Sequence, residues 1–316
     1  MQTPAFTPVL HHYPNSPFAE KIRAIFGYKN LDWCSVIAPD IMPKPDLQAL
    51  TGGYRRVPVL QIGADIYCDT ALIANVIDEL SPAKSLYPKE VAGAAHLTAQ
   101  WADHFVFWAA MGYNFQPAGV AQLFANAQPE MMKAFAEDRK AMGSKRKPPF
   151  EAAGEYKAYL RGLNNMLEQG ESLFLFGNAP TIADFAAYHP LWFTQTRTPS
   201  LATIFDATPI VKQWLSRMAR FSALGKERMQ PFSIANALDI AKNAQPVDLS
   251  TGKFCDEHGI ALGDRVSIAA ESFGTETSEG ELVAATQNRY VIRRVDPNLG
   301  ILHVHFPRIG FNLKAV

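Results

Sequence analysis

The fold of this chain is decided by the stretch YRRVPVLQIGADIYCDT, residues 54–70. It predicts a strand interrupted by Pro58, a tight turn, a second short strand, and a helix that begins at Asp69-Thr70. A proline within a strand cannot donate a ladder hydrogen bond, so this strand should be peripheral or begin there. With a cis peptide bond at Pro58, the neighbouring backbone could pair with an extended ligand. The start of the following helix suits a small carboxylate. The stretch therefore predicts a site for the backbone and charged head of a peptide.

The residues upstream complete the first unit. Residues 8–13 predict a buried strand, and residues 14–26 a loop that enters a helix, with Ser16 as N-cap and Pro17 at the first helical position. A further strand is predicted at residues 33–37. The order strand, helix, strand, loop, proline-bearing strand, strand, helix is typical of a thioredoxin-like α/β domain.

A second motif lies downstream, at residues 175–185. It is a turn followed by Thr181-x-x-Asp184, close to a capping box, at the start of an apolar helix. Together with residues 16–23, Val57-Pro58 and residues 69–73, this motif resembles the cytosolic glutathione transferase superfamily over roughly residues 8–225. The Ser-Pro-Phe-Ala run is similar to omega-type and related bacterial members.

Composition indicates an ordinary globular protein. The 316 residues are 48% hydrophobic and 19% charged, with 30 basic and 30 acidic side chains, so no net field steers nucleic acid or an anionic membrane. No run approaches the ~20 apolar residues of a membrane helix, and residues 1–8 lack a targeting pattern. The three cysteines lack metal or redox spacing. We therefore expect a cytoplasmic protein with no membrane, nucleic-acid or metal partner.

Three regions are predicted along the chain. Residues 1–82 should form the thioredoxin-like, glutathione-binding domain, residues 90–240 an all-α substrate domain, and residues 247–316 a small antiparallel β domain. The last is absent from the ordinary family. Its alternating residues predict a packed accessory domain with its own core, which adds to an interface or shields part of the substrate cleft. We expect it to contribute no residue to the glutathione site.

The resemblance implies that Ser16 stabilises the thiolate of glutathione at the start of the first helix. A hydroxyl and a helix dipole both favour a sulfur anion there. Serine cannot form the mixed disulfide that a cysteine would, which favours transferase chemistry over thiol reduction. Three alternatives stay open: Ser16 is only a helix cap, Asn15 donates to the sulfur, or Tyr13 does so as in other classes.

The resemblance also implies the residues that bind glutathione. The backbone of Val57, before Pro58, should pair with the cysteinyl part. Asp69 should contact the γ-glutamyl ammonium, and Thr70 with the helix N–H groups its carboxylate. Arg56 could pair with the glycyl carboxylate; Arg55 is the other candidate, and either could be merely solvated.

The second substrate is expected against the helical domain. Its pocket is predicted to include Trp101, His104, Phe105 and Trp108, which recur at helical spacing, although such a stripe is commonly core. Tyr13 and Asn15 could join them. Elsewhere, His303 and His305 share one strand face as a possible metal pair, but the sequence shows no third ligand.

These features predict a glutathione S-transferase that conjugates glutathione to a small hydrophobic electrophile, with glutathione as co-substrate and no metal. The resemblance implies a homodimer. The alternative is a glutathione-transferase-like binding protein with little turnover, whose partner contacts lie in the C-terminal β domain.

Overall fold

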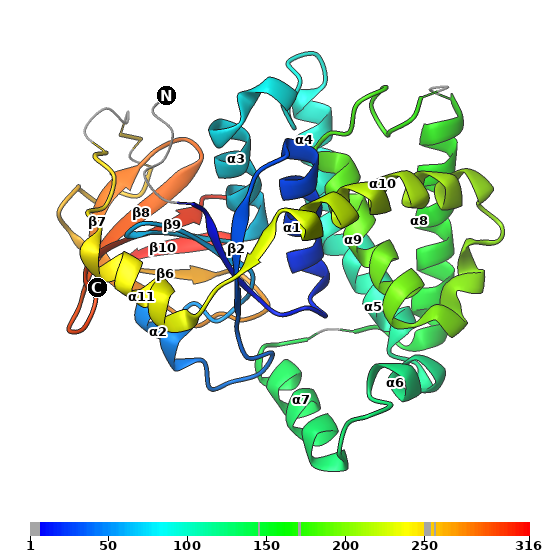
Figure 1. Ribbon diagram of the computed structural model, residues 1–316, viewed down its shortest axis with the longest axis horizontal. Coiled ribbons are helices and arrows are strands. Elements are labelled where there is room, and N and C mark those ends of the chain that lie inside the picture. Colours follow the sequence, from blue (N-terminus) through cyan, green and yellow to red (C-terminus); the bar gives the residue numbers. More distant parts are fainter. Residues whose placement is uncertain (1–6, 145, 170–171, 250–253, 256) are drawn as a thin grey trace.

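The computed structural model describes residues 7–144, 146–169, 172–249, 254–255 and 257–316 (Figure 1). Most of the stretch inspected for a targeting signal, residues 1–6, lies outside this range. A sheet occupies one side of the molecule and a group of helices the other. Among the described residues, no helix is long and apolar enough to cross a membrane.

The first unit is thioredoxin-like, as predicted. β1 pairs in parallel with β2 and antiparallel with β3, and β3 pairs antiparallel with β4. The peptide bond between Val57 and Pro58 is cis, and Pro58 directly precedes β3. The elements are β1 (Val9–His12), α1 (Pro17–Lys29), β2 (Trp33–Ile37), α2 (Pro45–Thr51), β3 (Val59–Ile62), β4 (Asp65–Cys68) and α3 (Thr70–Leu80).

The helical region follows and packs on α1. α1 packs along α10, and Trp33 Nε1 of β2 donates to Gly225 O of α10 at 2.8 Å. The predicted capping box is present: Thr181 N donates to the Asp184 carboxylate at 2.9 Å, and Asp184 is fully buried. The helices are α4 (Ala92–Trp101), a π-helical segment (Ala102–Val106), α5 (Phe107–Asn114), α6 (Pro117–Leu123), α7 (Pro129–Ala141), α8 (Pro149–Gln169), α9 (Ile182–Arg197) and α10 (Pro209–Glu227).

The C-terminal part is a run of antiparallel strands. After β5 (Met229–Pro231), which pairs with β2, and α11 (Ile234–Asn243), the chain forms these strands. They are β6 (Arg265–Ala270), β7 (Ser278–Ala285), β8 (Arg289–Asp296), β9 (Gly300–Pro307) and β10 (Phe311–Ala315).

These strands continue the thioredoxin sheet instead of forming a separate barrel. β9 pairs in parallel with β4, and the strand order is β10-β6-β7-β8-β9-β4-β3-β1-β2-β5. One apolar cluster also spans the joint, with Leu50 and Ile66 of the first unit packed with Val266 and Leu302 of the last. The C-terminal region therefore has an apolar core, but it shares this core with the first unit, because both cover one face of a common sheet.

Candidate active site

A cleft of about 1210 Å³ lies where the three regions meet. Its wall includes the start of α1, the Val57-Pro58 segment and the start of α3. Helices α4, α5 and α7 supply a second side, and loops between the C-terminal strands a third. Protein ligand sites commonly have volumes of about 300–1,000 Å³, so this cleft has room for a tripeptide and a second molecule.

Ser16 stands at the N-terminus of α1 and lines the cleft. The side chain is 2% exposed, and its Oγ accepts a hydrogen bond from Ala19 N at 3.1 Å. Since the hydroxyl uses its oxygen as the cap, its proton is still available to a group in the cleft. Capping and a role toward a ligand are thus compatible at this residue. The two alternatives, Asn15 and Tyr13, line the same cleft.

The predicted peptide-binding residues converge on this end of the cleft. Val57, Pro58, Asp69 and Thr70 all line it. Asp69 is the N-cap of α3, with φ of 75°, and its Oδ1 accepts from Ala71 N at 3.0 Å. The N-terminus of α3 therefore borders the cleft beside a carboxylate and a hydroxyl.

The two arginines of this segment have different surroundings. Arg55 is buried and forms ion pairs with Asp138 of α7 and, at 3.0 Å, with Glu276 after β6, so it joins all three regions. Arg56 lies in the cleft, its guanidinium 3.6 Å from Asp69 and over the ring of Phe311 at 5.2 Å. Both arginines line the cleft, but the Arg55 guanidinium is held by two carboxylates, whereas the Arg56 guanidinium lies beside the carboxylate of Asp69.

Lys44 is a cleft residue that sequence reasoning missed. It is 4% exposed, and its Nζ donates to Arg55 O at 3.3 Å. Burial, reinforced by the positive charges of Arg139 and Arg55, lowers its pKa to about 8. Within the described residues no carboxylate forms an ion pair with Lys44, so its ammonium is a ready partner for an anion in the cleft. Nothing in the sequence around residue 44 marks it.

Arg139 of α7 brings the helical region over the same end. Its guanidinium donates to Asp40 O at 2.9 Å and to the Tyr13 hydroxyl at 3.4 Å. The Tyr13 hydroxyl thereby accepts a hydrogen bond from the Arg139 guanidinium, and the centre of the Tyr13 ring lies 5.9 Å from Lys44 Nζ. α7 thus covers the cleft from outside, a placement that its polar sequence does not reveal.

The aromatic wall only partly matches the predicted stripe. His104 and Trp108 line the cleft, but Trp101 and Phe105 do not. Trp101 packs edge-on against Tyr159 at 5.2 Å, and Phe105 is 62% exposed. The reason is the π-helical segment of residues 102–106, whose wider turn changes the direction of the side chains that precede and follow it.

The C-terminal region closes the remaining side. Phe273 packs edge-on against Trp108 at 5.3 Å, and Gly274 N donates to Met142 O at 2.8 Å. Phe311 lies over Arg56, as described above. The expectation that this region shields the cleft agrees with these contacts. The shared sheet brings Phe311 of β10 beside Arg56, so this region borders the same cleft, and the expectation that it contributes no residue to the glutathione site stays a prediction.

Beneath the cleft lies a buried network that joins the first unit to the helices. Lys21 of α1 is 1% exposed and pairs with Asp103 Oδ2 at 2.6 Å, and its Nζ donates to Thr70 Oγ1 at 3.4 Å. The Asp103 Oδ1 also contacts His189 Nε2 at 2.9 Å. Burial alone would raise the pKa of Asp103, but Lys21 and His189 lower it to about 2. Thr70 is thus held by a charged pair.

A thioredoxin-like unit and an all-helical region, with a cleft between them that opens at a helix N-terminus, form the architecture that the family resemblance predicts. A family model described as the glutathione S-transferase N-terminal domain matches residues 10–85, and one described as the C-terminal domain matches residues 121–217. A search of curated proteins gave no match.

Solved structures of similar proteins support the same family assignment. A GST-like protein from Pseudomonas syringae is 39% identical, with a TM-score of 0.81, over 98% of this chain and 99% of that one. A glutathione S-transferase from Rhodospirillum rubrum F11 is 18% identical, TM-score 0.51, over 69% of this chain and 91% of its own. A glutathione transferase from Phanerochaete chrysosporium is 16% identical, TM-score 0.55, over 68% and 97%.

The chain therefore belongs to the glutathione transferase superfamily. The Pseudomonas protein matches it almost throughout, whereas the other two cover little more than two thirds of it, which indicates that the added C-terminal strands are shared with some relatives only.

Proposed function

We propose that the protein is a glutathione S-transferase that adds the glutathione thiolate to a small hydrophobic electrophile. The observation that carries the proposal is the position of the buried Ser16 hydroxyl, at the N-terminus of α1 and on the wall of the cleft. Its O–H and the positive end of the helix both stabilise a thiolate relative to the thiol, so the thiol of bound glutathione ionises at a lower pH.

Glutathione would lie along the Val57 segment. The backbone of Val57 would pair with the cysteinyl part, and the N-terminus of α3 with Thr70 would receive the γ-glutamyl carboxylate. Asp69 would face the γ-glutamyl ammonium. For the glycyl carboxylate we assign Lys44 in place of Arg56, since Lys44 has no ion-pair partner in the described chain and Arg56 lies beside Asp69.

The electrophile would occupy the apolar part of the cleft, between the helices and the C-terminal loops. This wall is aromatic, with Phe107 and Trp108 of α5, Phe135 of α7 and Phe273. Rings of this kind bind flat apolar molecules and exclude water from the thiolate, which increases its reactivity. We further propose that the chain forms a homodimer, as the resemblance implies; sedimentation at micromolar concentration yielding a single 34.9 kDa species would contradict this.

Replacement of Ser16 by alanine tests the mechanism. Loss of one hydrogen bond to a charged group corresponds to roughly 1.5–3 kcal/mol, so the rate of conjugation to a generic aromatic halide should fall about ten- to a hundredfold. The pKa of the bound thiol, read from thiolate absorbance, should rise, while the affinity for glutathione changes by only a few-fold. Asn15→Ala and Tyr13→Phe identify the donor if Ser16→Ala leaves both quantities unchanged.

A matched control separates the loss of a helix cap from the loss of thiolate stabilisation. Ser233 caps α11 as Ser16 caps α1, accepting from Asn236 N at 3.1 Å, and it lies outside the cleft. Ser233→Ala should therefore reproduce the loss of stability, about 1 kcal/mol, with no change in turnover. If the parent protein is retained on glutathione resin but shows no turnover, a binding protein is favoured instead. If it shows neither retention nor turnover, the proposed site is wrong.

A further inference from the structure

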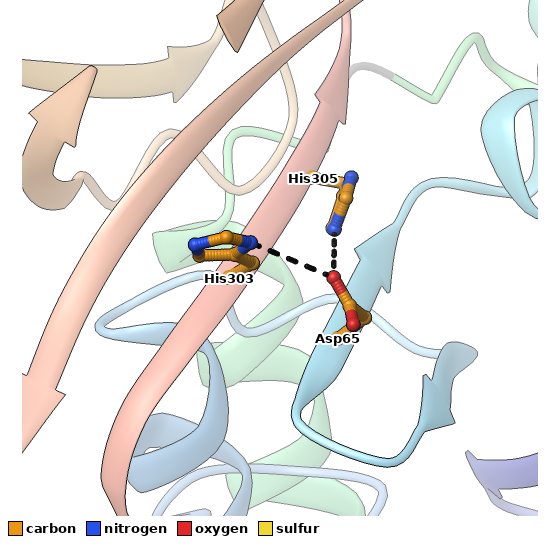
Figure 2. Close-up of side chains that lie close together, drawn as sticks. All are labelled: Asp65, His303 and His305. Atoms are coloured by element: carbon orange, nitrogen blue, oxygen red, sulfur yellow. Dashed lines mark hydrogen bonds and ion pairs between the residues drawn. The ribbon is translucent and has the colours of Figure 1, made fainter. Parts of the chain in front are cut away.

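Two histidines of β9 meet a carboxylate of β4 at the joint of the sheet. Asp65 and His303 are paired in register, and His305 follows two residues later on the same face. Figure 2 shows both imidazoles directed at the Asp65 carboxylate. Asp65 Oδ1 lies 2.7 Å from His305 Nε2 and 3.8 Å from His303 Nδ1. The sequence showed no third group beside the histidine pair; in the fold Asp65, 240 residues from His305 along the chain, lies there.

The cluster is enclosed and anchored. Side-chain exposure is 0% for His305, 6% for Asp65 and 13% for His303. The other Asp65 oxygen accepts from Val247 N at 2.8 Å, which fixes the carboxylate and leaves Oδ1 toward the histidines. The ring of His305 stacks on Tyr67 with a centroid separation of 4.3 Å. Each group is therefore oriented before any ligand arrives.

His303 Nδ1 is the informative atom. It is buried, directed at Asp65, and has no hydrogen-bond partner among the described residues. A buried polar atom without a partner is energetically unfavourable and calls for an explanation such as an ion. Arg293 of β8 pairs in register with His303, but its charge repels a bound cation only weakly, because its guanidinium forms an ion pair with Glu281 at 2.5 Å.

We propose that Asp65, His303 and His305 bind a divalent transition-metal ion, Zn²⁺ by the chemistry of the donors. Two imidazoles and one carboxylate are ligands that Zn²⁺ prefers, whereas Mg²⁺ and Ca²⁺ require more oxygen donors. The three ligand atoms lie within 4.8 Å of one another. Tetrahedral zinc with bonds of about 2.0–2.1 Å separates its ligands by about 3.3 Å, so small side-chain rotations suffice.

The site would retain an open coordination position. His303 also lines a cavity of about 350 Å³ with Val247, Leu249 and Arg293, so a water or a small anion can reach the metal from that side. The ion would join β4 to β9 and thereby hold the C-terminal strands on the thioredoxin unit. This site is distinct from the glutathione cleft, since none of its three ligands lines that cleft.

Zinc binding to the intact chain tests the proposal against a simple hydrogen-bonded pair. The purified protein is stripped with a chelator, dialysed against Zn²⁺ without glutathione, and its metal content measured by mass spectrometry. We expect one zinc per chain in the parent. His303→Ala and His303→Gln should weaken zinc binding at least about a hundredfold, more than the 10–100-fold effect of losing an outer-shell partner.

The matched control is His258→Ala, which removes an exposed histidine from the same region and should bind zinc like the parent. Co²⁺ provides a second readout, since the parent and His258→Ala, but not the His303 variants, should show the visible bands of a tetrahedral cobalt site. The glutamine variant retains side-chain volume if the alanine variant folds poorly. Either no zinc in the parent, or equal binding by the parent and a folded His303 variant, would overturn the proposal.

Discussion

Replacing Asp103 by asparagine should destabilise the protein by about 3–5 kcal/mol, because it leaves a buried charge without its partner. The Lys21 ammonium is 1% exposed and 2.6 Å from Asp103 Oδ2. After the change its remaining described partner is Thr70 Oγ1, at 3.4 Å. Asparagine keeps the shape of the side chain, so no cavity forms and the loss is electrostatic. Burial lowers the pKa of His189, which is therefore neutral and neither replaces nor competes with that charge.

Urea unfolding followed by tryptophan fluorescence at pH 7.5 measures the effect, with the slope against denaturant required to stay constant. The control is Asp206→Asn, which breaks a pair of similar length, 2.8 Å to Lys212 Nζ, whose side chains are 52% and 63% exposed. An exposed pair contributes at most about 1 kcal/mol. If Asp103→Asn is no more destabilising than Asp206→Asn, then Lys21 is not the uncompensated charge we describe, and the reasoning fails. A Lys21→Met, Asp103→Leu double variant should recover most of the loss.

Two further outcomes follow from the packing and the burial of ionisable groups. Gly225→Ala would place its Cβ 2.1 Å from Arg23 O and should destabilise the protein by about 1–3 kcal/mol or more. Gly162→Ala has open space around its Cβ and should stabilise the protein by about 0.5–1 kcal/mol. Equal urea midpoints for the two variants would contradict this. Burial, with Arg23 as a second cause, lowers the pKa of His12 to about 3, so its contribution to stability is complete above the unfolded pKa of 6.5 and is lost as pH falls toward 3. Between pH 6 and pH 5 the unfolding free energy of the parent should therefore fall more steeply than that of His12→Gln, by up to about 1.4 kcal/mol per pH unit. Parallel plots of unfolding free energy against pH for the two proteins would show that His12 is protonated in the folded state.

The sequence predicted the thioredoxin-like order and the helical region because their signals are local. A proline at residue 58 before a strand, a serine cap at Ser16 and the capping box at Thr181 each act over a few residues. The structure has all three. Glycine–backbone contacts between α1 and α10 carry no such signal, because they depend on where two distant helices cross.

The walls of the candidate site could be predicted where they rest on local patterns and not where they rest on packing. Ser16, Val57 and Asp69, each singled out by a local pattern, all line the cleft, whereas their roles toward glutathione stay predictions. Lys44 was not singled out, since its burial in the fold is what makes it notable and no residue pattern indicates that burial. The helical stripe failed at Trp101 and Phe105 because a 3.6-residue period cannot anticipate a π-helical turn.

The continuous sheet has a consequence for synthesis of the chain. Strand β4 is complete early, but its partner β9 follows after some 240 residues, the separation of Asp65 and His305. At about 5–20 residues per second, the edge of β4 therefore stays without its neighbour for about 10–50 s on the ribosome. An open edge with unpaired N–H and C=O groups recruits other strands, so this interval is when the nascent chain is most exposed to mispairing and most in need of a chaperone.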